Sequence, residues 1–130
     1  MTVLVDTSVL VQFLRRVPSD EVVRLRALEL SEPLAVTEVI FMEVLAGARD
    51  ERHLAQLHEF LGGFEHLAVS GIDDFTTAAA LYRGCRGRGE TIRQMTDCLI
   101  AAVAIRNDVP VLHADRDFDV LARHTPLRVA

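Results

Sequence analysis

The chain has 130 residues, half of them hydrophobic and a quarter charged, which predicts one globular domain over residues 1–130 and excludes a disordered chain. Its apolar stretches fall short of the roughly 20 residues that a membrane span needs, and its N-terminus is too short and too acidic for a secretory signal, so we expect a cytoplasmic protein with no membrane association. The net charge of −5 does not exclude a nucleic-acid partner, because it does not say where the charges lie. All 14 residues of the Lys/Arg class are arginines, which excludes mechanisms that need a lysine, such as P-loop nucleotide binding and Schiff-base formation.

Short apolar runs alternate with amphipathic segments along the whole chain. The predicted strands are residues 2–5, 34–36, 64–69, 110–113 and 127–129. The predicted helices are residues 7–16, 19–30, 37–46, 50–61, from 73 or 74 to 86, and 95–107, with a helical turn at 118–122. This alternation predicts an α/β fold with a central, mainly parallel sheet flanked by helices. In such folds functional residues lie outside the carboxyl ends of the strands.

Acidic residues directly follow two of the predicted strands. Asp6 follows the first strand, and Asp115 and Asp117 follow the strand at 110–113. The parallel sheet would bring all three carboxylates to one edge. Two structural explanations stay open: Asp6 could cap the helix that follows it, and Asp115 and Asp117 could lie in a solvated turn.

Two further carboxylates lie in apolar helices. Glu43 has Val39, Ile40 and Gly47 as neighbours on its helix face, and a lone carboxylate there is costly unless it is paired or bound to a cation. A partly exposed position or an arginine partner would also account for it. Gly47 leaves room beside Glu43 for a ligand or for backbone. Asp97 opens the most apolar helix, where it could also be a first-turn acid that favours the helix dipole.

Carboxylates that gather without histidine or cysteine are hard oxygen ligands, which suit Mg²⁺ or Mn²⁺ and not zinc. The chain has no Cys-x-x-Cys or His-x-x-x-His pair, so a zinc site of the usual kind is excluded. Like charges at this spacing need a cation, since some would otherwise be protonated. Such a site has the equipment for metal-assisted phosphodiester hydrolysis.

The order and spacing of four motifs resemble those of the PIN domain, specifically the VapC group of bacterial toxin ribonucleases, from Val3 to Phe118. The motifs are Val5-Asp6-Thr7-Ser8, Glu43 with Gly47, Gly89-Glu90-Thr91 leading to Asp97-Cys98-Leu99-Ile100-Ala101-Ala102, and Asp115-Arg116-Asp117-Phe118. No single motif is specific, but the ordered set in a chain of this length is. The resemblance implies a PIN-like α/β domain with an acidic pocket for one or two Mg²⁺ or Mn²⁺ ions.

By matching motif positions, Asp6, Glu43, Asp97 and Asp115 would form the acidic quartet, Asp117 would be an additional metal-site acid, and Ser8 would orient a water or a carboxylate. The expected activity is endoribonuclease cleavage of tRNA or ribosomal RNA, inhibited by a cognate VapB-like antitoxin, in a homodimer. We expect Asp6, Asp97 and Asp115 to hold a metal that activates a water for in-line attack, giving a 5′-phosphate and a 3′-hydroxyl. Glu43 would hold the metal through water or act as general base, which the sequence does not separate.

Four arginines, Arg83, Arg86, Arg88 and Arg93, surround the glycine-rich stretch before Asp97, opposed only by Glu90. They are candidate contacts for RNA phosphates, with a solvated helix end as the alternative. A second basic stretch, from Arg15 to Arg26, is interpreted as ordinary surface. The apolar faces of residues 19–30 and 50–61 serve either the core or the docking of an antitoxin helix or a second copy.

Two other functions compete with an active nuclease. A PIN-like module could bind RNA or a partner without cleaving, although binding RNA does not require an anionic pocket. A small-molecule phosphohydrolase is the other alternative, but the commonest fold of that kind expects Asp-x-Asp after the first strand and a late lysine, and this chain has neither.

Overall fold

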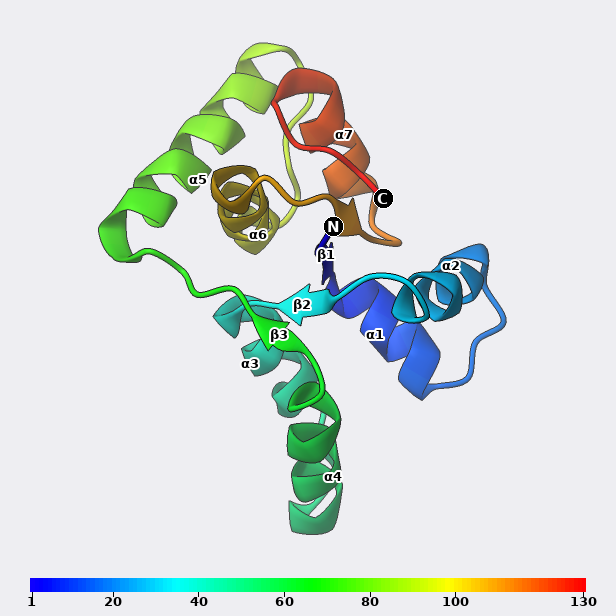
Figure 1. Cartoon of the computed structure of the whole chain (residues 1–130). Coiled ribbons are helices and arrows are strands. Elements are labelled where there is room, and N and C mark those ends of the chain that lie inside the picture. Colours follow the sequence, from blue (N-terminus) through cyan, green and yellow to red (C-terminus); the bar gives the residue numbers. More distant parts are fainter.

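The computed structural model describes all 130 residues and contains one four-stranded sheet, ordered β3-β2-β1-β4 with every pair parallel (Figure 1). The strands are β1 (Val3–Val5), β2 (Leu34–Val36), β3 (Glu65–His66) and β4 (Val111–Leu112). In the centre, Leu4 lies opposite Ala35 on one side and Val111 on the other. Because all strands are parallel, their carboxyl ends meet at one edge, as the sequence predicts.

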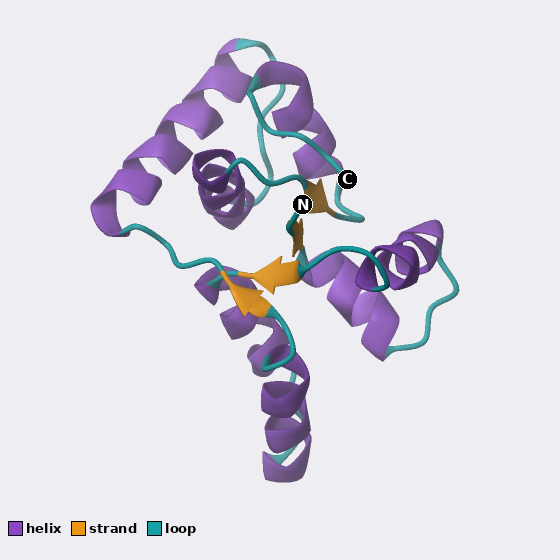
Figure 2. Cartoon of the chain, viewed as in Figure 1, coloured by secondary structure: helices purple, strands orange, loops and turns teal.

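Seven helices surround the sheet (Figure 2). They are α1 (Thr7–Leu14), α2 (Asp20–Glu29), α3 (Glu38–Ala46), α4 (Glu51–Leu61), α5 (Gly71–Gly87), α6 (Met95–Asn107) and α7 (Arg116–His124). In Figure 1, α5, α6 and α7 gather above the sheet, α3 and α4 lie below it, and α1 packs beside α2 at one side. No helix is both long and apolar enough to cross a bilayer.

Several helices begin at side-chain N-caps that the sequence predicts. Ser19 accepts the Val22 N–H at the start of α2, and Asp50 accepts the His53 N–H at the start of α4. Asp6 and Asp115 cap α1 and α7 in the same way. The predicted boundaries of β2 and of α6 agree with the structure.

Helix α6 is the centre of the core. Eight consecutive residues, from Asp97 to Ala104, are buried, because α5, α7 and α3 all pack against this helix. Its run of small side chains lets neighbouring helices approach closely. Asp97 therefore belongs to the most buried helix of the fold.

Four predicted boundaries are wrong. Only Glu65 and His66 of residues 64–69 form a strand, since they lie at the sheet edge and pair with β2 alone. Residues 127–129 contribute one bridge, Val111 to Val129, in place of a strand. The expected turn at 118–122 is the centre of the longer helix α7, which buries Phe118 and Leu121. Helix α5 begins at Gly71, before the predicted start, because Asp74 turns inward to accept the Ser70 N–H.

Candidate metal centre

Asp6 and Asp115 meet at the carboxyl edge of the sheet because their strands are neighbours. Val5 of β1 lies opposite Leu112 of β4, and the Asp6 N–H donates to the Leu112 carbonyl at 2.9 Å. Each aspartate also caps the next helix, as the structural explanation of Asp6 predicts. Asp6 is in addition close enough to Asp97 for its charge to raise the pKa of Asp97. Capping fixes each carboxylate near its helix N-terminus, where negative charge is favoured.

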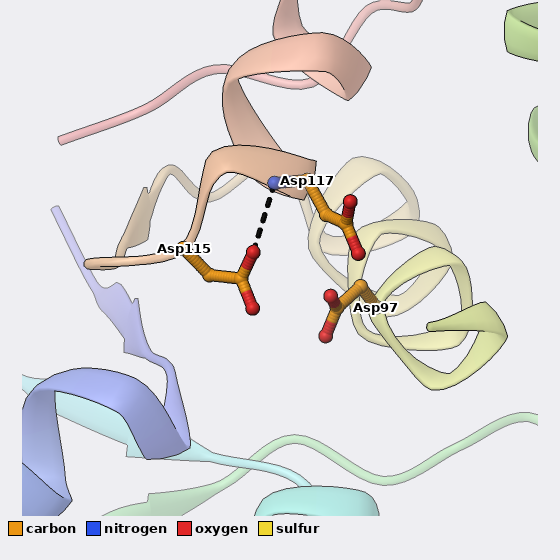
Figure 3. A group of neighbouring side chains, drawn as sticks. All are labelled: Asp97, Asp115 and Asp117. Carbon is orange, nitrogen blue, oxygen red and sulfur yellow. Dashed lines mark hydrogen bonds between the residues drawn. The ribbon is translucent and has the colours of Figure 1, made fainter. Parts of the chain in front are cut away.

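Asp97, Asp115 and Asp117 form a compact cluster in which one oxygen from each lies within 4.8 Å of the others (Figure 3). Asp97 comes from α6 and the other two from the start of α7, and their carboxylates point into a common space. Asp97 is 3% exposed and Asp117 is 2% exposed. The Oδ2 atom of Asp97 is buried and has no hydrogen-bond partner. Such an oxygen is costly unless a ligand satisfies it.

The protonation of Asp97 reflects this enclosure. Burial, followed by the neighbouring carboxyls of Asp117, Asp6 and Asp115, raises the pKa of Asp97 to about 9. Near neutral pH and without a cation, Asp97 therefore keeps its proton. A divalent cation would supply the positive charge that the ionised form needs.

Asp117 is the carboxylate that the protein itself keeps ionised. Burial would raise its pKa, but the backbone N–H of Arg93, the neighbouring Asp97 carboxyl, the backbone N–H of Gln94 and the charge of Arg93 lower it. Both backbone N–H groups donate to the Asp117 carboxylate at 3.1 Å. The loop before α6 is thereby attached to the start of α7, which fixes Asp97 relative to Asp117.

Ser8 has the orienting position that its place in the motif implies. Its hydroxyl and its backbone N–H, the latter at 3.0 Å, both donate to Asp6 Oδ2. The same hydroxyl accepts the Ala114 N–H at 2.9 Å. Ser8 therefore joins Asp6 to the loop that carries Asp115.

Glu43 lies beside the cluster, half-buried on α3. Its Oε1 accepts the Thr7 hydroxyl at 2.9 Å. Burial raises the pKa of Glu43, and the charges of Asp6 and Asp115 add to this rise. The structure therefore brings all five predicted acids to one region, and Glu43 has no arginine in ion-pair contact.

Three contacts of the site were not anticipated. Thr7 anchors Glu43, and the only signal in the sequence was a hydroxyl next to Asp6. His113 accepts the Asp115 N–H on Nδ1 at 3.1 Å, and its Nε2 lies 3.3 Å from the exposed Asp119 carboxylate. Arg93, expected as an RNA contact, lies with its guanidinium 3.4 Å from Asp115 Oδ1 and 3.6 Å from Asp117 Oδ1.

The other members of the basic group lie apart from the carboxylates. Arg83 and Arg86 are on α5, where Arg86 stacks on Tyr82, and Arg88 caps the end of that helix. Glu90, the acid among them, pairs with Arg123 and His124 of α7. Of these four arginines, Arg93 is therefore the one whose guanidinium contacts the acidic cluster.

The donor set fits a hard divalent cation. It consists of carboxylate oxygens with a seryl hydroxyl nearby, it includes a buried oxygen without a partner, and it contains no thiolate. Asp97, Asp115 and Asp117 supply the mutually close oxygens, and Asp6 and Glu43 lie beside them.

Comparison with known proteins gives one consistent family. A family model of the PIN domain matches residues 3–124. The chain is 42% identical over 130 residues to Ribonuclease VapC11 of Mycobacterium tuberculosis and to VapC ribonuclease Mb1587 of Mycobacterium bovis, covering 98% of this chain and 97% of each relative. It is 33% identical over 124 residues to Ribonuclease VapC51 of Mycobacterium tuberculosis, covering 94% of this chain and 86% of that one.

Solved structures share the fold. VapBC2 from Rickettsia felis, crystallised with a DNA fragment from its promoter, matches with a TM-score of 0.80 at 20% identity, covering 100% of this chain and 98% of that chain. VapBC-5 from Mycobacterium tuberculosis matches with a TM-score of 0.67 at 26% identity, covering 98% and 96%.

Proposed function

This chain belongs to the PIN-domain family, in its VapC branch, and from that premise we propose that it is a divalent-metal-dependent endoribonuclease toxin of the cytoplasm that hydrolyses phosphodiester bonds in structured RNA, tRNA or ribosomal RNA. The relatives named as ribonucleases support the activity. The observation that carries the metal dependence is the buried Asp97 Oδ2, which has no hydrogen-bond partner and belongs to a group of three closely spaced carboxylates.

Asp97, Asp115 and Asp117, with Asp6 beside them, would hold Mg²⁺ or Mn²⁺. A divalent cation supplies positive charge to the phosphate oxygens and makes water more acidic at neutral pH. Asp6 is kept in place by Ser8, and Asp117 by the backbone of Arg93 and Gln94, so the carboxylates are positioned before substrate arrives.

Glu43 is assigned as the acceptor of the proton of the attacking water. Thr7 occupies its Oε1, which leaves Oε2 available, and the raised pKa of Glu43 brings it closer to neutral. The new bond joins the water oxygen to phosphorus, the bond from phosphorus to the 3′ oxygen breaks, and the leaving 3′ oxygen takes a proton from solvent. The products are a 5′-phosphate and a 3′-hydroxyl, whereas a cyclic phosphate would require attack by the 2′-hydroxyl and would contradict this assignment. Holding the cation through water is the other role open to Glu43.

The test is incubation of the purified protein, freed of any partner, with total bacterial RNA and Mg²⁺ or Mn²⁺, followed by mapping of the RNA ends. We expect discrete cuts that disappear in EDTA and in Asp97→Asn. Asp73→Asn is the matched control, because it makes the same change at an exposed aspartate of α5 that lies outside the site. RNA binding without cleavage under any metal would favour the non-cleaving module. Turnover of a generic phosphomonoester would favour the small-molecule phosphohydrolase.

We also propose a VapB-like antitoxin as partner. The support is a hollow of about 580 Å³ between α1, α2 and the end of α4, with an apolar lining that includes Phe13, Leu25 and Phe60. Leu25, Leu28 and Leu57 are buried, so much of the apolar faces of α2 and α4 serves the core. A homodimer, which the resemblance implies, is proposed with it. Light scattering of the purified chain measures that state.

A further inference from the structure

A second hollow, of about 240 Å³, adjoins the acidic cluster through Glu43. It is bounded by the end of α1, the end of α3 and the first half of α4. Its apolar wall includes Val11, Val44 and Leu57. Glu43 lies in the wall of this hollow and is also close enough to Asp6 and Asp115 for their charges to raise its pKa. A group seated in the hollow would therefore lie beside Glu43, at the border of the acidic cluster.

Cationic side chains line the same hollow, although the protein as a whole is acidic. Arg15, at the C-cap of α1, and Arg49, just before α4, both border it. Neither guanidinium takes part in any ion pair of the structure. His53 borders it as well, and its Nδ1 accepts the Arg49 N–H at 3.1 Å, so the neutral ring carries its proton on Nε2 and can donate from there. Two arginines without ion-pair partners and one histidine thus line a hollow in which they could bind a phosphate.

Gly47 explains why the hollow is open. It borders the space one helical turn after Glu43, and a Cβ built on it meets only the Val44 carbonyl, at 3.4 Å. The backbone here is compatible with other residues, since φ is −82°. A side chain larger than alanine would project toward the space that the glycine leaves free. The room that the sequence predicts beside Glu43 is therefore present and belongs to this hollow.

We infer that this hollow binds one nucleotide of the RNA next to the scissile phosphate, with the base against the apolar wall and its phosphate held by Arg15 and Arg49. This inference rests on the proposed function and names the contact by which the same site selects its substrate. An apolar wall beside free guanidiniums matches a nucleotide, which has an apolar base face and an anionic phosphate. Arg93 contacts Asp115 and Asp117 and does not line this hollow, so Arg15 and Arg49 would be separate contacts for the RNA chain.

Two variants remove the charges and one fills the space. Arg15→Gln and Arg49→Gln each take away a guanidinium, and Gly47→Leu narrows the hollow without changing charge. The control is Arg52→Gln, at an exposed arginine of α4 outside the hollow. Binding of mixed bacterial tRNA is measured in EDTA over a range of salt concentrations, and steady-state cleavage in Mg²⁺ is measured on the RNA identified by end mapping.

We expect each arginine variant to weaken tRNA binding and raise KM about tenfold, with kcat nearly unchanged. The slope of log affinity against log salt should fall by about one, because one phosphate contact is lost. Gly47→Leu should raise KM with the salt slope unchanged, and Arg52→Gln should match wild type. Calorimetry with Mg²⁺ alone should give the wild-type affinity for all four variants.

The inference would be overturned if the wild-type protein cleaves RNA and the three variants Arg15→Gln, Arg49→Gln and Arg52→Gln have equal salt slopes and equal KM values. A wild-type protein that does not cleave RNA would contradict the proposed function instead, and the tRNA-binding comparison would still decide the nucleotide site. Arginine variants that bind tRNA normally but lose the antitoxin would assign the hollow to the protein partner and would likewise overturn the inference.

Discussion

The hydroxyl of Thr7 donates a 2.9 Å hydrogen bond to Glu43 Oε1, joining the first residue of α1 to the middle of α3. This bond lowers the pKa of Glu43, against the rise caused by burial and by the charges of Asp6 and Asp115. It also selects which carboxylate oxygen stays free. Thr7 thus sets both the orientation and the acidity of the carboxylate proposed to accept a proton.

Replacement of Thr7 by valine removes the hydroxyl and preserves the shape of the side chain. Loss of the hydrogen bond should raise the pKa of Glu43, so the acid limb of the kcat/KM profile should move to higher pH. The measurement is RNA cleavage from pH 5 to 9 with saturating Mg²⁺. Thr7→Ser restores a hydroxyl and should return the limb toward wild type. An acid limb that stays in place in Thr7→Val would show that Glu43 is not the base.

Asp97→Asn should abolish metal binding and cleavage and yet stabilise the metal-free protein. The raised pKa of Asp97, about 9, means that the folded protein retains a proton that the unfolded chain loses near pH 4. Stability of the metal-free protein should therefore decline as pH rises between these values, and the asparagine variant should lack this part of the decline. At pH 8 in EDTA we expect its Tm to exceed that of wild type by several degrees. This corresponds to a gain in the free energy of unfolding on the order of 1–2 kcal/mol.

Differential scanning calorimetry in EDTA at pH 5 and pH 8 measures this difference. Added Mg²⁺ should raise the Tm of wild type and leave that of the variant unchanged. An Asp97→Asn protein that is less stable than wild type at pH 8 without metal would show that the Asp97 carboxyl group does not destabilise the metal-free protein.

Arg93 contributes the guanidinium next to the cluster, at 3.4 Å from Asp115 and 3.6 Å from Asp117. Its side chain is 60% exposed, and the Asp117 carboxylate keeps its backbone donors without it. A cation bound to the carboxylates would repel this guanidinium, so Arg93→Gln should tighten Mg²⁺ binding about three- to tenfold by calorimetry. Arg116→Gln is the control, since Arg116 is exposed, follows Asp115 directly and forms no ion pair. An equal gain in both variants would indicate a general charge effect and not the contact of Arg93.

The apolar hollow proposed for the antitoxin is bordered by Glu29, Glu32 and Glu65. These carboxylates would complement basic side chains on a partner helix. Reversing exposed charges in the double variant Glu29→Arg, Glu65→Arg should weaken the complex with a VapB-like antitoxin about tenfold or more, mainly in a reduced association rate. Cleavage of RNA by the free protein should not change, because the hollow lies away from the carboxylates. Surface plasmon resonance gives the rates, and an unchanged association rate would assign the antitoxin to another surface.

From the sequence alone one could predict which acids would gather at the edge of the sheet, and in what order they occur. The signals for these acids are local and can be read from alternation, capping and burial patterns. They are the strand ends at Asp6 and Asp115, the carboxylate of Glu43 within an apolar helix, and Asp97 at the start of α6. A parallel sheet is enough to infer that such residues share an edge, since chain direction fixes which ends of the strands coincide. The caps at Ser19 and Asp50 were predictable for the same reason, because an N-cap depends on a few neighbouring residues.

Contacts between distant segments were decided only by the tertiary structure. Thr7 with Glu43 and Arg93 with Asp115 depend on helix packing and loop path, which leave no periodic pattern in the chain. Arg15 was interpreted as ordinary surface from its basic neighbours, and only the packing of α1 and α4 against α3 places it with Arg49 in one hollow. The short β3 and the single bridge at Val129 have the same origin, since strand length is set by the partner strand that each segment finds. Caps and strand ends depend on adjacent residues and can therefore be predicted from the sequence, whereas contacts between distant segments depend on how the whole chain packs.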